Sequence, residues 1–165
     1  MVLHEFTLFL GKLFFQNALF LWYNTIEINL KEKNMASDIV KVEFTNEFNG
    51  VMTAPKGTIL IGKQEGGFRP YNLLFGALAS CFYSTFLSIV EKKRLSFSGA
   101  SVEISGVHRE TPITTLEHVW IKMIIRGASD EKQFRRCVEL GTQYCSIHET
   151  ISKVATIETT VEFEK

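Results

Sequence analysis

The sequence predicts an α+β fold with mainly antiparallel sheets and one long central helix. Residues 71–90 carry no charge and end in a mostly basic turn, while short segments before and after them alternate apolar with polar side chains. Alternation with a period of two is typical of strands, whereas a continuous apolar run of this length is typical of a buried helix. With 165 residues, the chain is long enough for one domain with its own core.

The helix is expected over residues 70–94. Pro70 suits a first helical position, and Lys92 to Arg94 suit a helix C-terminus. Small residues among Leu and Phe predict burial on most faces, with Cys81 in the middle, where solvent has least access. A run of this length also meets the requirement for a membrane span, but the polar residues spread around it favour a soluble core helix, and no membrane contact is expected.

The other segments predict the element order βββαββααβ. Strands precede the long helix at residues 39–44, 47–53 and 58–62, with a hairpin turn at Asn49-Gly50, a strong turn signal. Strands at 97–107 and 119–126 follow it. A helix from Ser129, its expected N-cap, to Gly141 comes next. A short helix at 146–154 and a strand at 157–164 complete the order.

Residues 1–34 differ from the rest of the chain and are treated as an N-terminal extension, leaving a domain over 35–165. The extension is rich in Phe and Leu but has no positive start and no small-residue cleavage site. Lys31 to Met35 can be encoded by a purine-rich run ahead of a start codon, so we expect the physiological protein to begin at Met35. A native N-terminal peptide that starts earlier would contradict this.

Charge and cysteine content exclude several classes of function. Lys plus Arg equals Asp plus Glu, at 18 each, so no nucleic-acid partner is expected. Three widely spaced cysteines do not form the framework of a secreted protein, and they favour a reducing, cytoplasmic location. The sequence has no Cys-x-x-Cys and no His/Cys cluster at zinc-like spacing, so we expect no metal and no bound organic cofactor.

Two cysteines are candidate reactive groups. Cys81 lies within the long helix, where burial as a small hydrophobic residue is the alternative to reactivity. Cys145 lies between two predicted helices, where backbone N–H groups at the start of the second favour a thiolate. His148, three residues later, either assists Cys145 or packs the short helix. Cys137 lies on the apolar face of its helix and is expected in the core.

Two motifs resemble one known family. Pro-Tyr-x-Leu-Leu-x-Gly-Ala-Leu-Ala-Ser-Cys ends at Cys81, and Cys-x-Ile-His-x-Thr-Ile begins at Cys145. Together they are similar to the OsmC/Ohr family, the osmotically inducible protein C and organic hydroperoxide resistance proteins. The resemblance implies an intertwined homodimer in which Cys81 attacks a peroxide and becomes a sulfenic acid, which Cys145 resolves to a disulfide. An external dithiol would then restore both thiols.

The sequence also departs from that family. Its active peroxidases pair the reactive thiol with an Arg from the N-terminal strands and a Glu just after the helix-opening Pro, but Tyr71 and Asn72 follow Pro70 here. Residues 46–50 contain no Arg, and the nearby Arg69 does not match the family's position. Ser146 follows Cys145 where the family usually has Pro. Without a cation, we expect burial to raise the pKa of Cys81.

The expected function is thiol-dependent reduction of small apolar organic hydroperoxides in oxidative-stress defence. An aromatic pocket for the apolar tail is expected from Phe68, Phe75, Phe82 and Phe86. The alternative is a non-enzymatic, redox-sensing or ligand-binding protein that keeps the scaffold and both thiols but lacks the activating Arg and Glu.

Overall fold

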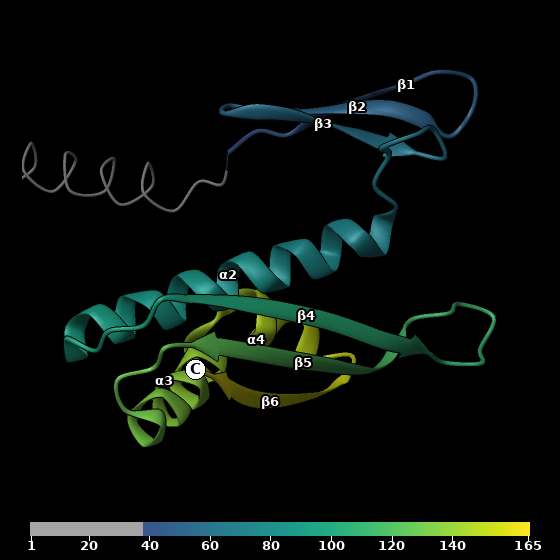
Figure 1. Ribbon diagram of the computed structural model, residues 1–165. Coiled ribbons are helices and arrows are strands. Elements are labelled where there is room, and N and C mark those ends of the chain that lie inside the picture. Colours follow the sequence, from purple (N-terminus) through teal and green to yellow (C-terminus); the bar gives the residue numbers. More distant parts are fainter. Residues whose placement is uncertain (1–37) are drawn as a thin grey trace, which may run out of the picture. The chain divides into compact units, whose positions relative to one another are not determined.

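A computed structural model describes residues 38–165, so the extension at 1–34 lies outside the described residues. The described chain divides into two compact units, residues 38–45 with 50–59 and residues 46–49 with 60–165. Its elements follow the predicted order, which confirms the α+β fold (Figure 1). They are β1 (Lys41–Phe44), β2 (Asn49–Ala54), β3 (Gly57–Gly62), α2 (Pro70–Lys93), β4 (Gly99–His108), β5 (Leu116–Arg126), α3 (Glu131–Tyr144), α4 (Ser146–Ser152) and β6 (Thr156–Glu164).

The first sheet has the strand order β1-β2-β3, and its first turn is not where the sequence predicts it. Asn49 and Gly50 belong to β2, and Gly50 pairs with Phe44 in the antiparallel ladder. A Cβ atom on Gly50 would lie 2.6 Å from the Phe44 ring, so close packing between strands requires this glycine. The strands turn instead over residues 45–48, and β2 turns into β3 at Pro55 and Lys56.

The second sheet has the order β4-β5-β6 and carries the core. β4 and β5 are antiparallel, whereas β6 returns after two helices and pairs with β5 in parallel, which is the exception to the predicted antiparallel pattern. The alternating apolar residues of β5 (Val119, Ile121, Met123 and Ile125) are all buried, as their period of two predicts. One face of this sheet therefore lies against the helices.

Helix α2 contributes one stripe to that core. Its buried residues are Leu78, Phe82, Phe86 and Val90, spaced one every fourth residue. The prediction that most of its faces are buried is wrong for the single chain, because a second stripe is exposed. That stripe contains Gly76, Ala77, Ser80, Ser84 and Ser88. The small side chains predicted to bring neighbours close therefore face outward.

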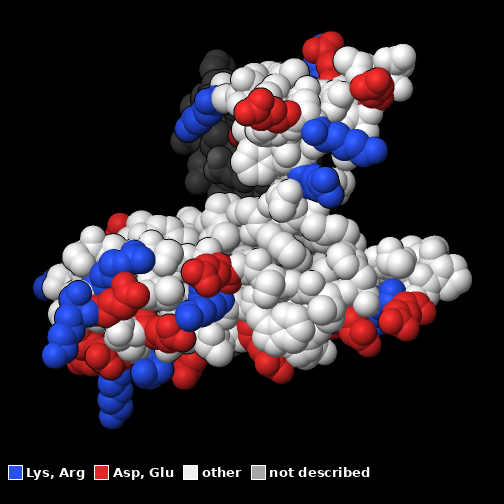
Figure 2. All heavy atoms as spheres, turned by 45° about the vertical axis from the view of Figure 1, so that its right-hand side comes forward, with Lys and Arg blue, Asp and Glu red and all other residues white. Residues whose placement is uncertain are grey.

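By length and composition, α2 meets the requirements for a membrane span, although 22% of its apolar window is buried inside the protein. Its buried stripe packs against α3, α4 and β4, which is how a core helix is held. On the face of the larger unit seen in Figure 2, clusters of acidic and basic side chains flank a broad uncharged surface.

Helices α3 and α4 follow each other with one residue between them. Asp130, not Ser129, is the N-cap of α3, and its carboxylate accepts a hydrogen bond of 3.0 Å from the Gln133 backbone N–H. Gly141 does not end α3 as predicted but lies buried inside it. A Cβ atom there would approach Phe82 to 3.1 Å and Phe86 to 3.3 Å, so this glycine lets α3 pack closely on α2.

Candidate active site

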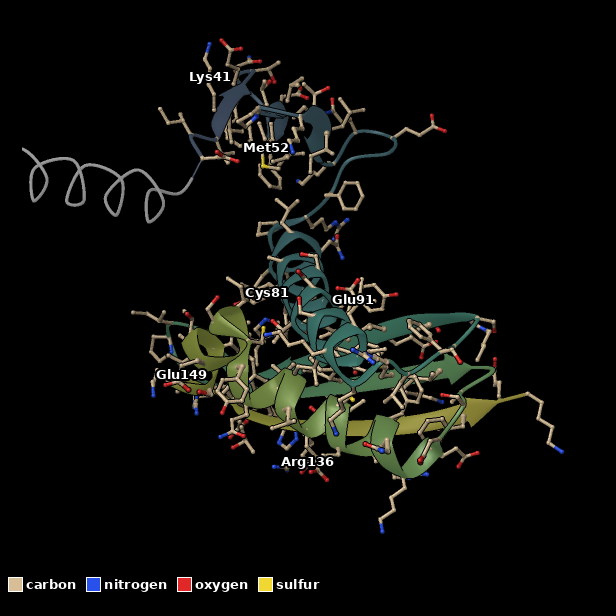
Figure 3. The ribbon with its side chains drawn as sticks, turned by 90° about the vertical axis from the view of Figure 1, so that its left-hand side faces the viewer. Lys41, Met52, Cys81, Glu91, Arg136 and Glu149 are labelled. Carbon is tan, nitrogen blue, oxygen red and sulfur yellow. The ribbon has the colours of Figure 1, made fainter. Side chains whose placement is uncertain are left out.

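The structure brings Cys81 and Cys145 together although 64 positions separate them in the sequence. Cys81 lies on the side of α2 that faces α4 (Figure 3). Cys145 is the single residue between α3 and α4 and is the N-cap of α4. Each thiol influences the pKa of the other, so the two side chains lie within reach of one another. Packing of α4 against α2 therefore creates a dithiol pair.

Hydrogen-bond donors surround both sulfur atoms. The Ser146 Oγ lies 3.7 Å from the Cys81 Sγ, and the Ile147 backbone N–H also bonds to Cys81. The His148 backbone N–H donates to the Cys145 Sγ across 3.4 Å. Since Cys145 accepts from His148, its own proton is free to point at Cys81. The donors near Cys81 favour an anion there, whereas burial of Cys145 favours its protonated thiol.

The pKa of Cys81 is lowered, which overturns the expectation from the sequence. Burial is the largest single influence and raises the pKa, but hydrogen bonds outweigh it. They come from the Ile147 N–H, the Cys145 thiol, and the Ser146 hydroxyl and N–H, which are all uncharged. Cys81 is only half-buried, so the desolvation cost is moderate. Neutral donors can therefore stabilise the thiolate in place of a cation.

The pKa of Cys145 is raised, so the thiolate expected at the start of α4 is disfavoured on this residue. Burial raises the pKa most, the His148 N–H lowers it, and a negative charge on Cys81 raises it further. Cys145 is 1% exposed. The Ile147 N–H lowers the pKa of both thiols, but at Cys145 burial outweighs it. The two thiols thus have opposite protonation preferences.

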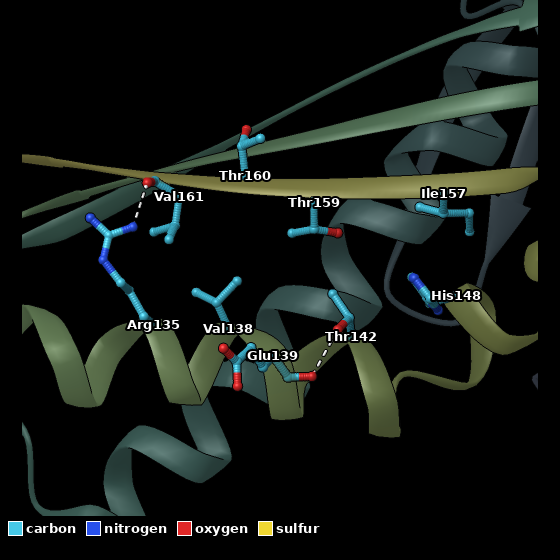
Figure 4. A pocket seen from close by; sticks show the side chains of 9 residues that line it. All are labelled: Arg135, Val138, Glu139, Thr142, His148, Ile157, Thr159, Thr160 and Val161. Atoms are coloured by element: carbon cyan, nitrogen blue, oxygen red, sulfur yellow. Dashed lines mark hydrogen bonds between the residues drawn. The ribbon is translucent and has the colours of Figure 1, made fainter.

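His148 contacts Cys145 through its backbone N–H, while its imidazole points into a separate groove. The ring lines a groove of about 650 Å³ between α3, α4 and β6 (Figure 4). The other lining residues are Arg135, Val138, Glu139, Thr142, Ile157, Thr159, Thr160 and Val161. Burial lowers the pKa of His148, although the Glu149 carboxylate opposes this. This position fits the interpretation that the His148 side chain packs the short helix.

The remaining predicted site residues are dispersed. Arg69 caps the start of α2, twelve residues before Cys81, which corresponds to about 18 Å along the helix axis. Phe82 and Phe86 are completely buried and fill the core. Phe75 packs beside Tyr71 and near Gly106, and Phe68 is largely exposed before α2 begins. The structure does not bring these four rings together as one pocket.

The donors Ser146 and Ile147 are the site residues that the sequence prediction missed. In the sequence, Ser146 was noted only because the family usually has Pro at this position. The signal available was its place directly after the candidate thiol, at the first position of a helix, where backbone N–H groups have no partner within the helix. Which sulfur these groups reach depends on how α4 packs against α2, and spacing alone does not encode that.

Solved structures share this fold. A hypothetical protein from Aquifex aeolicus is 26% identical with a TM-score of 0.69, covering 79% of this chain and 100% of its own. An OsmC-like protein from Mycoplasma pneumoniae is 15% identical with a TM-score of 0.71, covering 79% and 99%. An organic hydroperoxide resistance protein OsmC from Legionella pneumophila is 15% identical with a TM-score of 0.63, covering 78% and 98%.

No curated protein matches the sequence significantly. The family model described as OsmC-like protein matches residues 62–160, more than half of the chain, and this range includes both Cys81 and Cys145. The resemblance noted in the sequence is therefore confirmed, and this chain belongs to the family of OsmC-like proteins.

Proposed function

We propose that this protein reduces organic hydroperoxides with its Cys81 and Cys145 thiols, in defence against oxidative stress. The observation that carries the proposal is that α4 packs against α2 so that Ser146 contacts the Cys81 sulfur and the His148 N–H donates to the Cys145 sulfur, with the pKa of Cys81 lowered and that of Cys145 raised. The names of structural neighbours also support it, since those from Legionella pneumophila and Bacillus subtilis are called organic hydroperoxide resistance proteins.

The reaction needs only the two thiols and the peroxide. The Cys81 thiolate attacks one peroxide oxygen, the O–O bond breaks, and the alkoxide leaves and takes up a proton to become an alcohol. Cys81 is then a sulfenic acid. Cys145 attacks its sulfur, the S–O bond breaks, and water leaves as the disulfide forms. Two thiols and one hydroperoxide thus give one disulfide, one alcohol and one water.

The opposite pKa shifts set the order of these steps. Before oxidation, charge on Cys81 keeps the pKa of Cys145 raised, which holds a proton on the resolving thiol. Conversion of Cys81 to the neutral sulfenic acid removes this charge and lowers the pKa of Cys145 again. Cys145 therefore becomes a better nucleophile when there is a sulfenic acid to attack.

The substrate class and partners follow from the surroundings of Cys81. Residues 71–90 of α2 carry no charge, which favours an apolar hydroperoxide over an ionic one. A cellular dithiol would reduce the disulfide, and a reducing cytoplasm suits the free thiols. A second copy of the chain would cover the exposed small-residue stripe of α2, giving a homodimer.

The test is stopped-flow oxidation of the reduced protein by cumene hydroperoxide. The wild type should consume peroxide far faster than free cysteine and form a Cys81–Cys145 disulfide, identified by mass spectrometry. Cys81→Ser should abolish the fast reaction, and Cys145→Ser should leave the first step intact but accumulate the sulfenic acid. Cys137→Ala is the matched control, because Cys137 is buried in α3 and should not take part.

The alternative function is redox sensing or ligand binding without rapid turnover. The absence of an acid at Tyr71 and Asn72, and of an arginine at residues 46–50, favours it. Oxidation of the wild type no faster than free cysteine would contradict the peroxidase proposal and favour this alternative.

A further inference from the structure

We propose that Ser146 is a catalytic residue of this site, whose hydroxyl donates a hydrogen bond to the Cys81 sulfur and holds it as the reactive thiolate. The inference rests on the proposed function, because this bond matters for turnover only if Cys81 attacks the peroxide. Ser146 is the first residue of α4, and its Oγ lies 3.7 Å from the Cys81 Sγ, within the range of a hydrogen bond to sulfur.

The direction of this hydrogen bond depends on the state of Cys81. In the protonated state, either atom can be the donor. A thiolate has no proton, so the hydroxyl must then donate, and a bond to a charged acceptor is stronger than one to a neutral thiol. The contact therefore stabilises the charged form more than the neutral form. This difference also agrees with the lowered pKa of Cys81.

The position of Ser146 is fixed by its own helix. The Thr150 hydroxyl donates to the Ser146 carbonyl across 2.9 Å, and the Glu149 N–H donates to the Cys145 carbonyl across 3.0 Å. Ser146 is nevertheless exposed, so its hydroxyl is not needed to satisfy the core. Substitution of the Ser146 side chain should therefore disturb little besides its contact with the Cys81 sulfur.

Other titratable groups near this turn act elsewhere. Cys145 is the titratable group that hydrogen-bonds to Cys81. The imidazole of His148 faces the groove between α3 and β6, and the Glu149 carboxylate pairs with Lys153. Arg69, the cation considered from the sequence, lies more than three helical turns from Cys81. Among these groups, Ser146 and Cys145 are the side chains positioned to tune Cys81.

The experiment measures the alkylation rate of Cys81 by iodoacetamide from pH 5 to 10, with site-resolved mass spectrometry, in the full chain. Ser146→Ala should slow alkylation at pH 7 by about three- to tenfold and leave the high-pH plateau unchanged, since only the thiolate population falls. Ser146→Thr keeps the hydroxyl and should restore the wild-type profile. Ser152→Ala, on the same helix, should have no effect.

Ser146→Pro provides a stronger variant that remains compatible with the fold. Proline suits the first position of a helix, and the extended backbone of Cys145 (φ −78°, ψ 115°) is the conformation that precedes proline. This change removes both the hydroxyl and the N–H, so it should slow alkylation at pH 7 at least as much as Ser146→Ala. An unchanged profile in Ser146→Ala would overturn the inference, and slowing in Ser146→Pro alone would assign the effect to the N–H instead of the hydroxyl.

Peroxide kinetics on the same variants separate this inference from the proposed function. If the wild type reduces cumene hydroperoxide rapidly, Ser146→Ala should lose about the same factor in that rate as in alkylation. If the wild type is no faster than free cysteine, the proposed function fails, while the alkylation profile still decides whether Ser146 tunes Cys81.

Discussion

Cys81 and Cys145 are chemically alike but should react very differently. Hydrogen bonds lower the pKa of Cys81, whereas burial raises the pKa of Cys145 and of Cys137. We predict that limiting iodoacetamide at pH 7 modifies Cys81 first, with the other two thiols reacting more than tenfold more slowly. The difference should shrink above the pKa of all three. Peptide mass spectrometry over a pH series provides the measurement, and equal labelling at pH 7 would contradict the assignment.

The sequence singled out Cys81 and Cys145 and placed Cys145 correctly at the start of α4, but it predicted the wrong direction for the pKa of each thiol. Adjacency suggested that the N–H groups there would favour a thiolate on Cys145. In the structure the N–H groups act on both sulfurs, those of Ser146 and Ile147 lowering the pKa of Cys81, while burial outweighs those of His148 and Ile147 at Cys145. Motif spacing predicted which cysteines the fold brings together, whereas their protonation depends on contacts between elements far apart in the chain.

Gly141 is the residue through which helices α2 and α3 pack closely. We predict that Gly141→Leu destabilises the protein by about 1–3 kcal/mol, because a side chain there would press against Phe82 and Phe86. Urea unfolding followed by circular dichroism measures the change. Gln143→Leu provides the matched control, since it adds the same side chain at an exposed position of the same helix. This variant should change the free energy of unfolding by less than about 0.5 kcal/mol. A neutral Gly141→Leu would contradict this packing.

Element types and their order were predictable, whereas two of the glycine signals were misleading. Period-two alternation identified β5 and β6, and the uncharged run identified α2. Gly50 and Gly141 were interpreted as a turn and a helix end. Both are instead sites where another element approaches closely, Phe44 in one case and Phe82 in the other. Glycine permits special backbone angles and close packing alike, and only the folded partner distinguishes these uses.

The whole molecule has a surface that one chain leaves uncovered. The exposed stripe of α2 consists of small, uncharged residues, and it runs along a helix whose opposite side is fully buried. In the first sheet, Val42, Val51 and Leu60 are each about two-fifths exposed. Small uncharged residues let another backbone approach closely, so the stripe suits a contact with a second chain. The homodimer proposed above would cover the α2 stripe.

We predict that the purified protein has about twice the 18.8 kDa mass of one chain by size-exclusion chromatography with light scattering. Ser84→Lys places a charge in the middle of the exposed α2 stripe and should shift the protein to monomer, because a buried unpaired charge is costly at an interface. Gln143→Lys, at an exposed position of α3, is the matched control and should remain dimeric. A monomeric wild type would contradict the dimer, and recovery of the native protein with membranes would instead favour a membrane-anchored protein held by residues 1–34.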